Sequence, residues 1–261
     1  MLIAVVLGLV EGLTEFLPVS STGHLILVED LLDFHGLVAK TFAVFIQLGA
    51  VLAVVVVYRR RFARLLAVRS GGVFAGIRGV ALLLLTTVPA MVVGLAFHED
   101  ILARLFNPFN VAVGLAAGGV WILLTERFLP APSTADLDHI TWKEALYVGL
   151  FQCLSLWPGM SRSASTILGG MIVGLDRRTA AEYSFFAAVP MMFAACAYDL
   201  GHSAASLRLE HVPFFALGFA VAFLSAWLGL RFLVRFVSRH TLVPFGWYRL
   251  AVAAAVFWFA R

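Results

Sequence analysis

Two short polar segments interrupt a chain that is otherwise strongly apolar. The first, EGLTEFLPVSSTGH, covers residues 11–24, and the second, WPGMSRSAST, covers residues 157–166. Glu11 and Glu15 are four residues apart, so a helix places both carboxylates on one face. Two acids in hydrocarbon must share a proton or hold a positive group between them. A divalent cation, Mg²⁺ or Ca²⁺, is the simplest such group because hard cations prefer oxygen ligands.

The residues that follow Pro18 are expected to form an anion site. Pro18 is predicted to end the first helix, and Ser20, Ser21 or Thr22 can cap the next one. A helix N-terminus that carries hydroxyls and free N–H groups binds anions. His24 lies one turn further and is a candidate general acid or base, with a purely structural role as the alternative.

The second segment offers the complementary charge. Arg162 lies between Ser161 and Ser163 at a predicted helix start, and Thr166 is one turn further on the same face. Arginine presents a planar fork of donors that suits phosphate oxygens, although an ion pair with one of the two acids is the alternative. A metal site beside these donors would suit a multiply charged phosphate. The apolar surroundings predict that the rest of the substrate is lipid.

Composition places these segments in a membrane. Of the 261 residues 62% are hydrophobic and only 13% are charged, and the mean hydropathy is +0.96. These values predict an all-α polytopic integral membrane protein. The net charge of +4 gives no reason to expect a nucleic-acid partner. Six apolar runs are long enough to cross the bilayer: 37–58, 78–97, 108–129, 180–200, 212–236 and 243–260.

Two further apolar stretches, 2–33 and 143–175, are broken in the middle by the polar segments. A helix from Leu2 to Phe16 reaches only about 22 Å, whereas the hydrocarbon core is about 30 Å thick. Each stretch is therefore predicted to be a re-entrant helix–loop–helix. Such backbone is tolerated at membrane depth when it is buried in protein or lines a wet cavity.

The two halves of the chain resemble each other weakly. Residues 1–261 are predicted to form one membrane domain of two repeats, about 1–130 and 140–261, each with one re-entrant hairpin and three transmembrane helices. Chance similarity between apolar sequences is the alternative. If one residue is skipped before the prolines, the matched pairs are Gly8 and Gly149, Glu11 and Gln152, Thr14 and Ser155, Pro18 and Pro158, and Ser21 and Ser161.

Three crossings per half require the second repeat to be inverted relative to the first. The basic residues support this, because the positive-inside pattern assigns them to one face. The residues assigned to the cytoplasmic face are Arg59, Arg60, Arg61, Arg64, Arg69, Arg78, Arg127, Lys143, Arg177, Arg178, Arg235 and Arg239. Those left for the outer face are Lys40, Arg104, Arg208 and Arg261. The first hairpin is then expected to enter from outside, and the two polar tips to meet near mid-membrane.

Other features have simpler interpretations. Cys153 and Cys196 lie in apolar segments and are expected to be packing residues. The glycine pairs in GLAAG (114–118) and GMIVG (170–174) favour close helix packing, within the chain or between subunits, and so allow a homodimer. Arg249 lies inside the last span, where pairing with an acid or snorkelling to the interface is favoured over lining a substrate cavity.

The two polar segments together resemble the signature motifs of the bacterial undecaprenyl pyrophosphate phosphatase family, the bacitracin-resistance proteins. The Glu-x₃-Glu motif is represented by Glu11 and Glu15, and the PGxSRSxxT motif by residues 158–166. The resemblance implies hydrolysis of undecaprenyl pyrophosphate to undecaprenyl phosphate and inorganic phosphate. This reaction recycles the lipid carrier for peptidoglycan synthesis. The family also implies a bacterial cytoplasmic (inner) membrane protein with its active site open to the periplasm.

The resemblance also implies roles for individual residues. Glu11 and Glu15 would hold a divalent cation or assist proton transfer. Ser21 would attack the phosphate or position a water, with His24 as acid or base. The phosphates would be bound by Ser20, Thr22, Ser161, Arg162, Ser163 and Thr166. Because inverted repeats with broken helices are also a transporter design, a transporter or flippase of a polyprenyl phosphate is the alternative function.

Overall fold

The protein is seen in a computed structural model that describes residues 1–67, 72–129, 131–203 and 209–259. Regular structure within these residues is helical. The helices are α1 (Leu2–Thr14), α2 (Ser21–Leu31), α3 (Leu37–Val57), α4 (Arg59–Leu66), α5 (Gly76–Ala96), α6 (His98–Leu105), α7 (Pro108–Phe128), η1 (Leu137–His139), α8 (Trp142–Gln152), η2 (Cys153–Leu156), α9 (Arg162–Ile172), α10 (Arg177–Ser203), η4 (Leu209–His211), α11 (Val212–Val237) and α12 (Val243–Phe259).

Five helices are long and apolar enough to cross a membrane, and they coincide with five of the six predicted spans. These helices are α3, α5, α7, α10 and α11. The sixth predicted span corresponds to α12, which has 17 residues. At 1.5 Å per residue α12 is about 26 Å long, near the lower limit for crossing. The chain is therefore a multi-pass, all-helical membrane protein.

Both interrupted stretches consist of two short helices joined by a break. In the first, α1 ends at Thr14 and a turn covers residues 15–19. The helix therefore ends four residues before Pro18, which agrees with the predicted break because Pro18 has no N–H to donate to the Thr14 carbonyl. Glu15 keeps helical backbone angles, and its N–H donates to the Glu11 carbonyl at 2.9 Å. The two acids consequently keep the four-residue helical spacing that the sequence predicts.

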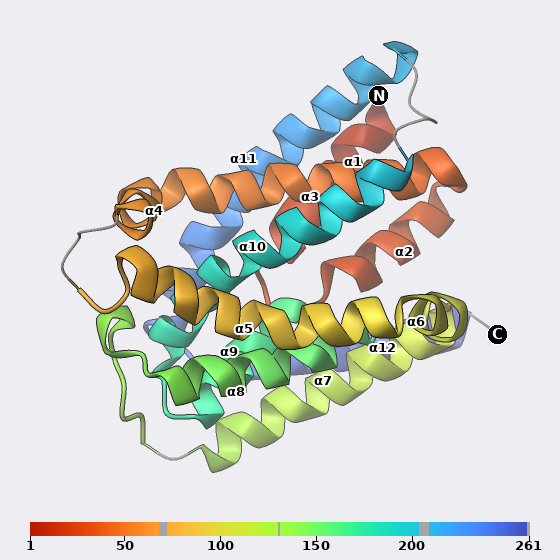
Figure 1. The fold of residues 1–261 in the computed structure, drawn as a ribbon. Coiled ribbons are helices and arrows are strands. Elements are labelled where there is room, and N and C mark those ends of the chain that lie inside the picture. The colour runs from red at the N-terminus through yellow and green to blue at the C-terminus, as the bar shows by residue number, and fades with distance from the viewer. Residues whose placement is uncertain (68–71, 130, 204–208, 260–261) are drawn as a thin grey trace.

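The two hairpins open toward opposite ends of the helical bundle (Figure 1). The N-terminus, α2 and α6 lie toward the right of the view, whereas α4 and the segment that leads into α8 lie at the left. Contacts tie the elements of the left end together. The Arg61 guanidinium donates to Asp138 at 3.1 Å, and Glu126 of α7 accepts hydrogen bonds from Arg177 and from the Leu242 N–H.

Most of the basic side chains assigned to the cytoplasm lie on the elements of this left end, which we call the basic end. They lie on α4, at the start of α5, at the end of α7, at the starts of α8 and α10, and at the end of α11. Lys40 in the first turn of α3 and Arg104 of α6 lie at the opposite end. Three arginines used in the sequence argument fall outside the described residues: Arg69, Arg208 and Arg261.

Helix packing is exchanged between the halves of the chain. Helix α1 of the first half packs on α11 of the second, and α8 of the second half packs on α5 of the first. Both contacts depend on glycine, because added side chains would collide with the facing backbone. A Cβ at Gly8 would lie 2.7 Å from the Gly218 carbonyl oxygen, and one at Gly149 would lie 2.7 Å from that of Thr86. The pairs α3–α11, α3–α10 and α7–α12 also join the halves.

Candidate active site

The breaks of the two hairpins meet inside the bundle through one ion pair. Arg162 Nη2 donates to Glu15 Oε1 at 2.7 Å, and the two side chains are only 12% and 8% exposed. The other carboxylate oxygen, Glu15 Oε2, accepts a hydrogen bond from Ser21 Oγ at 2.5 Å. Glu15 thus joins the first residues of α2 and α9. The predicted meeting of the two polar tips is present, with Arg162 as the positive group beside one of the acids.

Serine caps both of these helices in the same backbone conformation. Ser20 caps α2 with φ 74° and accepts from Gly23 N, while Ser161 caps α9 with φ 73° and accepts from Ala164 N. Positive φ is unfavourable for a residue with a side chain and is typically kept where the surroundings enforce it. Of the three predicted caps of α2, the structure therefore uses Ser20.

These caps correct the predicted alignment of the halves. Ser20 and Ser161 are 141 residues apart, the same separation as Glu11 and Gln152. No residue therefore has to be skipped, and Ser161 corresponds to Ser20 rather than to Ser21. The sequence alignment had followed the prolines, whereas the backbone repeats at the caps.

Arg162 is held by contacts from α10 as well as by Glu15. Its Nη1 donates to the Ser184 carbonyl at 3.2 Å and to Ser184 Oγ at 3.3 Å, and Thr166 Oγ1 lies 2.6 Å from the same hydroxyl. Its guanidinium lies over the Phe16 ring at 5.7 Å from the centroid. Among the described residues, however, the buried Nε–H has no acceptor. Arg162 therefore keeps one donor available within the site.

Glu11 is the other incomplete group of the site. Its side chain is fully buried, and neither carboxylate oxygen has a hydrogen-bond partner among the described residues. The charged groups whose fields reach it are Glu15, Arg162 and Glu29. An isolated buried carboxylate is costly, so this environment fits a cation bound beside Glu11. No cluster of three or more His, Cys, Asp or Glu residues suited to a metal occurs in the described ranges, so other ligands would be water and substrate oxygens.

The other hydroxyls that were predicted to bind phosphate differ in whether they already make hydrogen bonds within the protein. Ser163 Oγ donates to the Leu17 carbonyl at 2.8 Å and lies 3.0 Å from Ser161 Oγ, so it joins the two breaks. Thr166 Oγ1 also donates to the Arg162 carbonyl at 2.9 Å. Thr22 is half-buried and its hydroxyl makes no hydrogen bond with the described residues. The hydroxyls of Ser161 and Ser163 are thus already hydrogen-bonded within the protein, and these bonds shape the site.

His24 faces away from the acids and toward α12. Its Nδ1 lies 2.7 Å from the Ser20 carbonyl, and its Nε2 lies 2.7 Å from the Tyr248 hydroxyl. If Nδ1 carries the proton, Nε2 accepts from Tyr248. No hydrogen bond joins His24 to Glu11 or Glu15. Its direct partners are the cap of α2 and a tyrosine that the sequence analysis did not identify.

Arg249 departs from both interpretations favoured by the sequence. It neither pairs with an acid nor reaches the interface, because it is fully buried and its five N–H donors bond to backbone carbonyls. Two of these carbonyls belong to α7, one to the first break and two to the second. The acceptors are Gly114, Leu115, Pro18, Gly159 and Met160, at 2.7–3.2 Å.

Glycines of α7 make room for this arginine. A Cβ at Gly118 would lie 2.0 Å from Arg249 Nη2, and one at Gly114 would lie 2.3 Å from the Pro158 carbonyl oxygen. The small residues of GLAAG therefore serve packing within the chain. At GMIVG, a Cβ on Gly170 would lie 3.1 Å from Ala180 Cβ, which is also a contact within the chain. The homodimer remains a prediction.

The sequence analysis missed three residues that complete this region: Ser184, Tyr248 and, as a positioning residue, Arg249. Only Arg249 carried a signal, because a charged residue inside an apolar span is costly and needs partners. Ser184 and Tyr248 are ordinary residues of apolar helices whose partners become visible only in three dimensions.

Replacing Arg249 tests its role. We expect Arg249→Lys to destabilise the protein, because an ammonium has three donors and loses at least two of the five buried hydrogen bonds that the guanidinium makes. Each such loss costs about 1–3 kcal/mol, so the midpoint of thermal unfolding in detergent should fall by roughly 5–10 °C. Arg127→Lys, at an exposed position near the end of α7, is the matched control. An unchanged midpoint for Arg249→Lys would contradict the assigned role.

Comparison with known proteins gives a consistent result over the whole chain. The family model described as bacitracin resistance protein BacA matches residues 4–255. A protein of Nitratidesulfovibrio vulgaris named undecaprenyl-diphosphatase is 56% identical over 259 residues, which cover 99% of this chain and 98% of the relative. Proteins of the same name from Maridesulfovibrio salexigens and Solidesulfovibrio magneticus are 54% and 53% identical, and each alignment covers at least 97% of both chains. The chain therefore belongs to the bacitracin resistance protein BacA family.

Proposed function

We propose that this protein hydrolyses undecaprenyl pyrophosphate to undecaprenyl phosphate and inorganic phosphate. This reaction would recycle the lipid carrier for peptidoglycan synthesis and confer bacitracin resistance. The name undecaprenyl-diphosphatase, shared by relatives aligned over nearly their full length, supports the activity. The observation that carries the site assignment is the pair of incomplete groups, the Glu11 carboxylate and the Arg162 Nε–H, inside one buried cluster. A bound cation and a bound phosphate would satisfy one each.

Arg162 would bind the pyrophosphate. Its Nη groups are already fixed by Glu15 and Ser184, so the remaining Nε–H has a defined position before substrate arrives. Donors that are held in place need little reorganisation when charge develops on the phosphate. The Ser20 and Ser161 caps leave the first N–H groups of α2 and α9 inside the site, where helix N-termini favour anions.

Glu11 and Glu15 would hold a divalent cation, Mg²⁺ or Ca²⁺. When bound, the cation would offset negative charge on the pyrophosphate and polarise its oxygens. Two carboxylates with remaining positions filled by water and phosphate oxygens are a common arrangement for Mg²⁺. The unpaired oxygens of the fully buried Glu11 support this assignment.

Glu15 would act as the base for Ser21. The Ser21 hydroxyl already donates to Glu15 Oε2, so attack of Oγ on the terminal phosphorus would transfer its proton to that oxygen. The phosphoanhydride P–O bond would break, undecaprenyl phosphate would leave, and water would then cleave the phosphoserine to inorganic phosphate. In the alternative, Ser21 positions an attacking water. His24 would act as an acid or base on the side of the site that faces α12, where its Nε2 contacts the Tyr248 hydroxyl.

We further propose that the two halves form an inverted repeat in a bacterial cytoplasmic (inner) membrane, with the basic end in the cytoplasm. The exchanged packing of α1 on α11 and α8 on α5 supports the inversion, as do the identical caps at Ser20 and Ser161. The charge asymmetry supports the orientation. The α1–α2 hairpin would then enter from outside, which opens the site toward the periplasmic side. A transporter could share this design, but the diphosphatase relatives favour hydrolysis.

The first prediction concerns turnover. Purified protein in detergent should release phosphate from prenyl pyrophosphates with Mg²⁺ or Ca²⁺ present, and EDTA should abolish this release. Because a transporter needs no chemistry, it would release none. Arg162→Lys should lower turnover about 10²-fold or more by losing the planar fork, and Glu15→Gln by about 10²–10⁴-fold. The exposed Arg104→Lys is the control, and full activity in both site variants would refute the site.

The second prediction concerns the nucleophile. If Ser21 attacks, acid quenching during turnover should trap a phosphoserine that peptide mass spectrometry places at Ser21. Ser21→Ala should then lower turnover about 10³-fold or more, because the covalent route is lost. Thr22→Val should retain the phosphoserine, since Thr22 is not the proposed nucleophile. Substantial turnover by Ser21→Ala without any trapped phosphoenzyme would instead favour attack by water.

The third prediction concerns orientation. In a background with Cys153→Ala and Cys196→Ala, single cysteines replace Arg60 at the basic end or Glu99 on α6 at the opposite end. In intact spheroplasts a membrane-impermeant maleimide should label Glu99→Cys, whereas Arg60→Cys should react only after permeabilisation. The reverse pattern would contradict the proposed orientation while leaving the chemistry of the site unaffected.

A further inference from the structure

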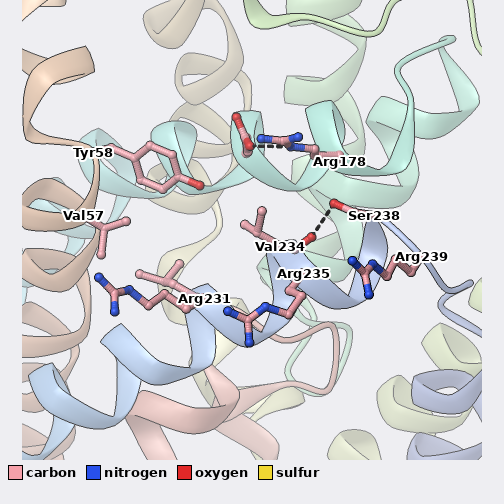
Figure 2. Close-up of a pocket in the computed structure, with 10 residues that line it drawn as sticks. Val57, Tyr58, Arg178, Arg231, Val234, Arg235, Ser238 and Arg239 are labelled. Atoms are coloured by element: carbon pink, nitrogen blue, oxygen red, sulfur yellow. Dashed lines mark hydrogen bonds and ion pairs between the residues drawn. The ribbon is translucent and has the colours of Figure 1, made fainter.

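A cavity lies at the basic end, and none of its lining residues belongs to the candidate active site. It has a volume of about 550 Å³ and lies between the end of α3, the start of α10 and the end of α11. Figure 2 shows Arg231, Arg235 and Arg239 along α11 and the turn after it, with Tyr58 and Arg178 across the cavity. A volume of this size is typical of small-ligand sites.

The charge around this cavity is strongly unbalanced. Its lining includes four arginines and a single acid, Glu182, which pairs with Arg178 at 3.0 Å. Within the described ranges, no carboxylate lies within ion-pairing distance of Arg231, Arg235 or Arg239. Arg231 and Arg235 are four residues apart on α11, a spacing at which like charges repel on a helix, and Arg239 adds a third positive charge in the turn that follows. An anion in the cavity would remove this repulsion.

The helix dipole and the positive-inside pattern account for part of the same charge distribution. Cations near the end of a helix are mildly stabilising, and basic residues gather at cytoplasmic faces. Neither effect requires the arginines to surround a cavity, or to stand opposite a further arginine and a tyrosine on other helices. The cavity therefore offers several N–H donors to an occupant with acceptor oxygens.

The same face of α11 offers an apolar track toward the middle of the membrane. Leu224 and Leu228 precede Arg231 and Arg235 at intervals of four, three and four residues, so the four share one helix face. Both leucines are well exposed, at 56% and 58%. A ligand whose charged head lies among the arginines can extend a hydrocarbon chain along these leucines. This combination favours a lipid over a free anion.

We propose that the cavity at the basic end binds the phosphate of a lipid phosphomonoester, with the chain of that lipid lying along Leu224 and Leu228. Basic pockets between helices on the cytoplasmic side commonly bind anionic headgroups. Three arginines without acidic partners suit a phosphomonoester, which carries close to two negative charges and three free oxygens. The proposal does not depend on the proposed hydrolysis, although the lipid product of that reaction belongs to this ligand class.

A photoreactive lipid tests the site in the whole protein. Phosphatidic acid with a diazirine in its acyl chain is incorporated into nanodiscs that contain the protein, and crosslinked peptides are mapped by mass spectrometry. We expect crosslinks on α11 near Leu224 and Leu228. Arg231→Gln combined with Arg235→Gln should reduce them about tenfold or more, because each arginine contributes about a factor of five to binding an anionic lipid.

Controls separate binding in this cavity from general attraction of anionic lipids to the basic end. Arg60→Gln, exposed at the same end, should leave the crosslinks unchanged, and the double variant should keep normal phosphate release, which shows that it is folded. Phosphatidylglycerol with the same diazirine chain should crosslink several-fold less, because its phosphodiester carries one charge. Equal crosslinking by both lipids, or yields insensitive to the double variant, would overturn the proposal. Displacement of phosphatidic acid by millimolar inorganic phosphate would identify a free-phosphate site and overturn the lipid assignment.

Discussion

The arrangement of the site depends on how the carbonyl groups of two broken helices are satisfied inside a membrane protein. A break at membrane depth leaves backbone acceptors without helical partners, and each unpaired one is costly. Arg249 addresses both breaks with one side chain, because three of its five donors bond to break carbonyls, those of Pro18, Gly159 and Met160, and the other two bond to carbonyls of α7. Glu15 precedes one of these breaks and Arg162 follows the other, so their ion pair requires the backbone that Arg249 holds.

The two buried arginines of this region differ in what they leave unsatisfied. Arg249 uses all its donors on backbone, and carbonyl dipoles surround its charge in place of a carboxylate. Arg162 pairs with Glu15 and keeps one buried N–H without an acceptor among the described residues. Because every N–H donor of Arg249 is hydrogen-bonded, this side chain is a rigid support. Arg162 has one N–H donor without an acceptor in the described part of the chain, which suits it to contact a ligand. The contrast supports a structural role for Arg249 and is consistent with the substrate contact proposed for Arg162.

Sequence reasoning predicted the spans, the broken helices and the meeting of Glu15 with Arg162, because these follow from hydropathy, length and the cost of charge in hydrocarbon. It did not predict the register of the repeat, since identity favoured the prolines while the backbone repeats at the capping serines. It also misjudged Arg249. The carbonyls to which this arginine donates come from three separate segments that meet only in the folded protein, and no local pattern indicates such a meeting.

If the proposed repeat is aligned at the capping serines, it relates the residues of the two halves that meet in the site. Ser21 and Arg162 are both the first residues of their helices, so the repeat brings a hydroxyl and a guanidinium to equivalent positions. Glu15 contacts both, one with each oxygen. At the position equivalent to Glu11, Gln152 donates to the Thr86 carbonyl, a bond that a carboxylate cannot make. The two similar backbones thus carry complementary side chains, and the oxygens of Glu11, which lack a hydrogen-bond donor within the described ranges, support the cation site proposed there.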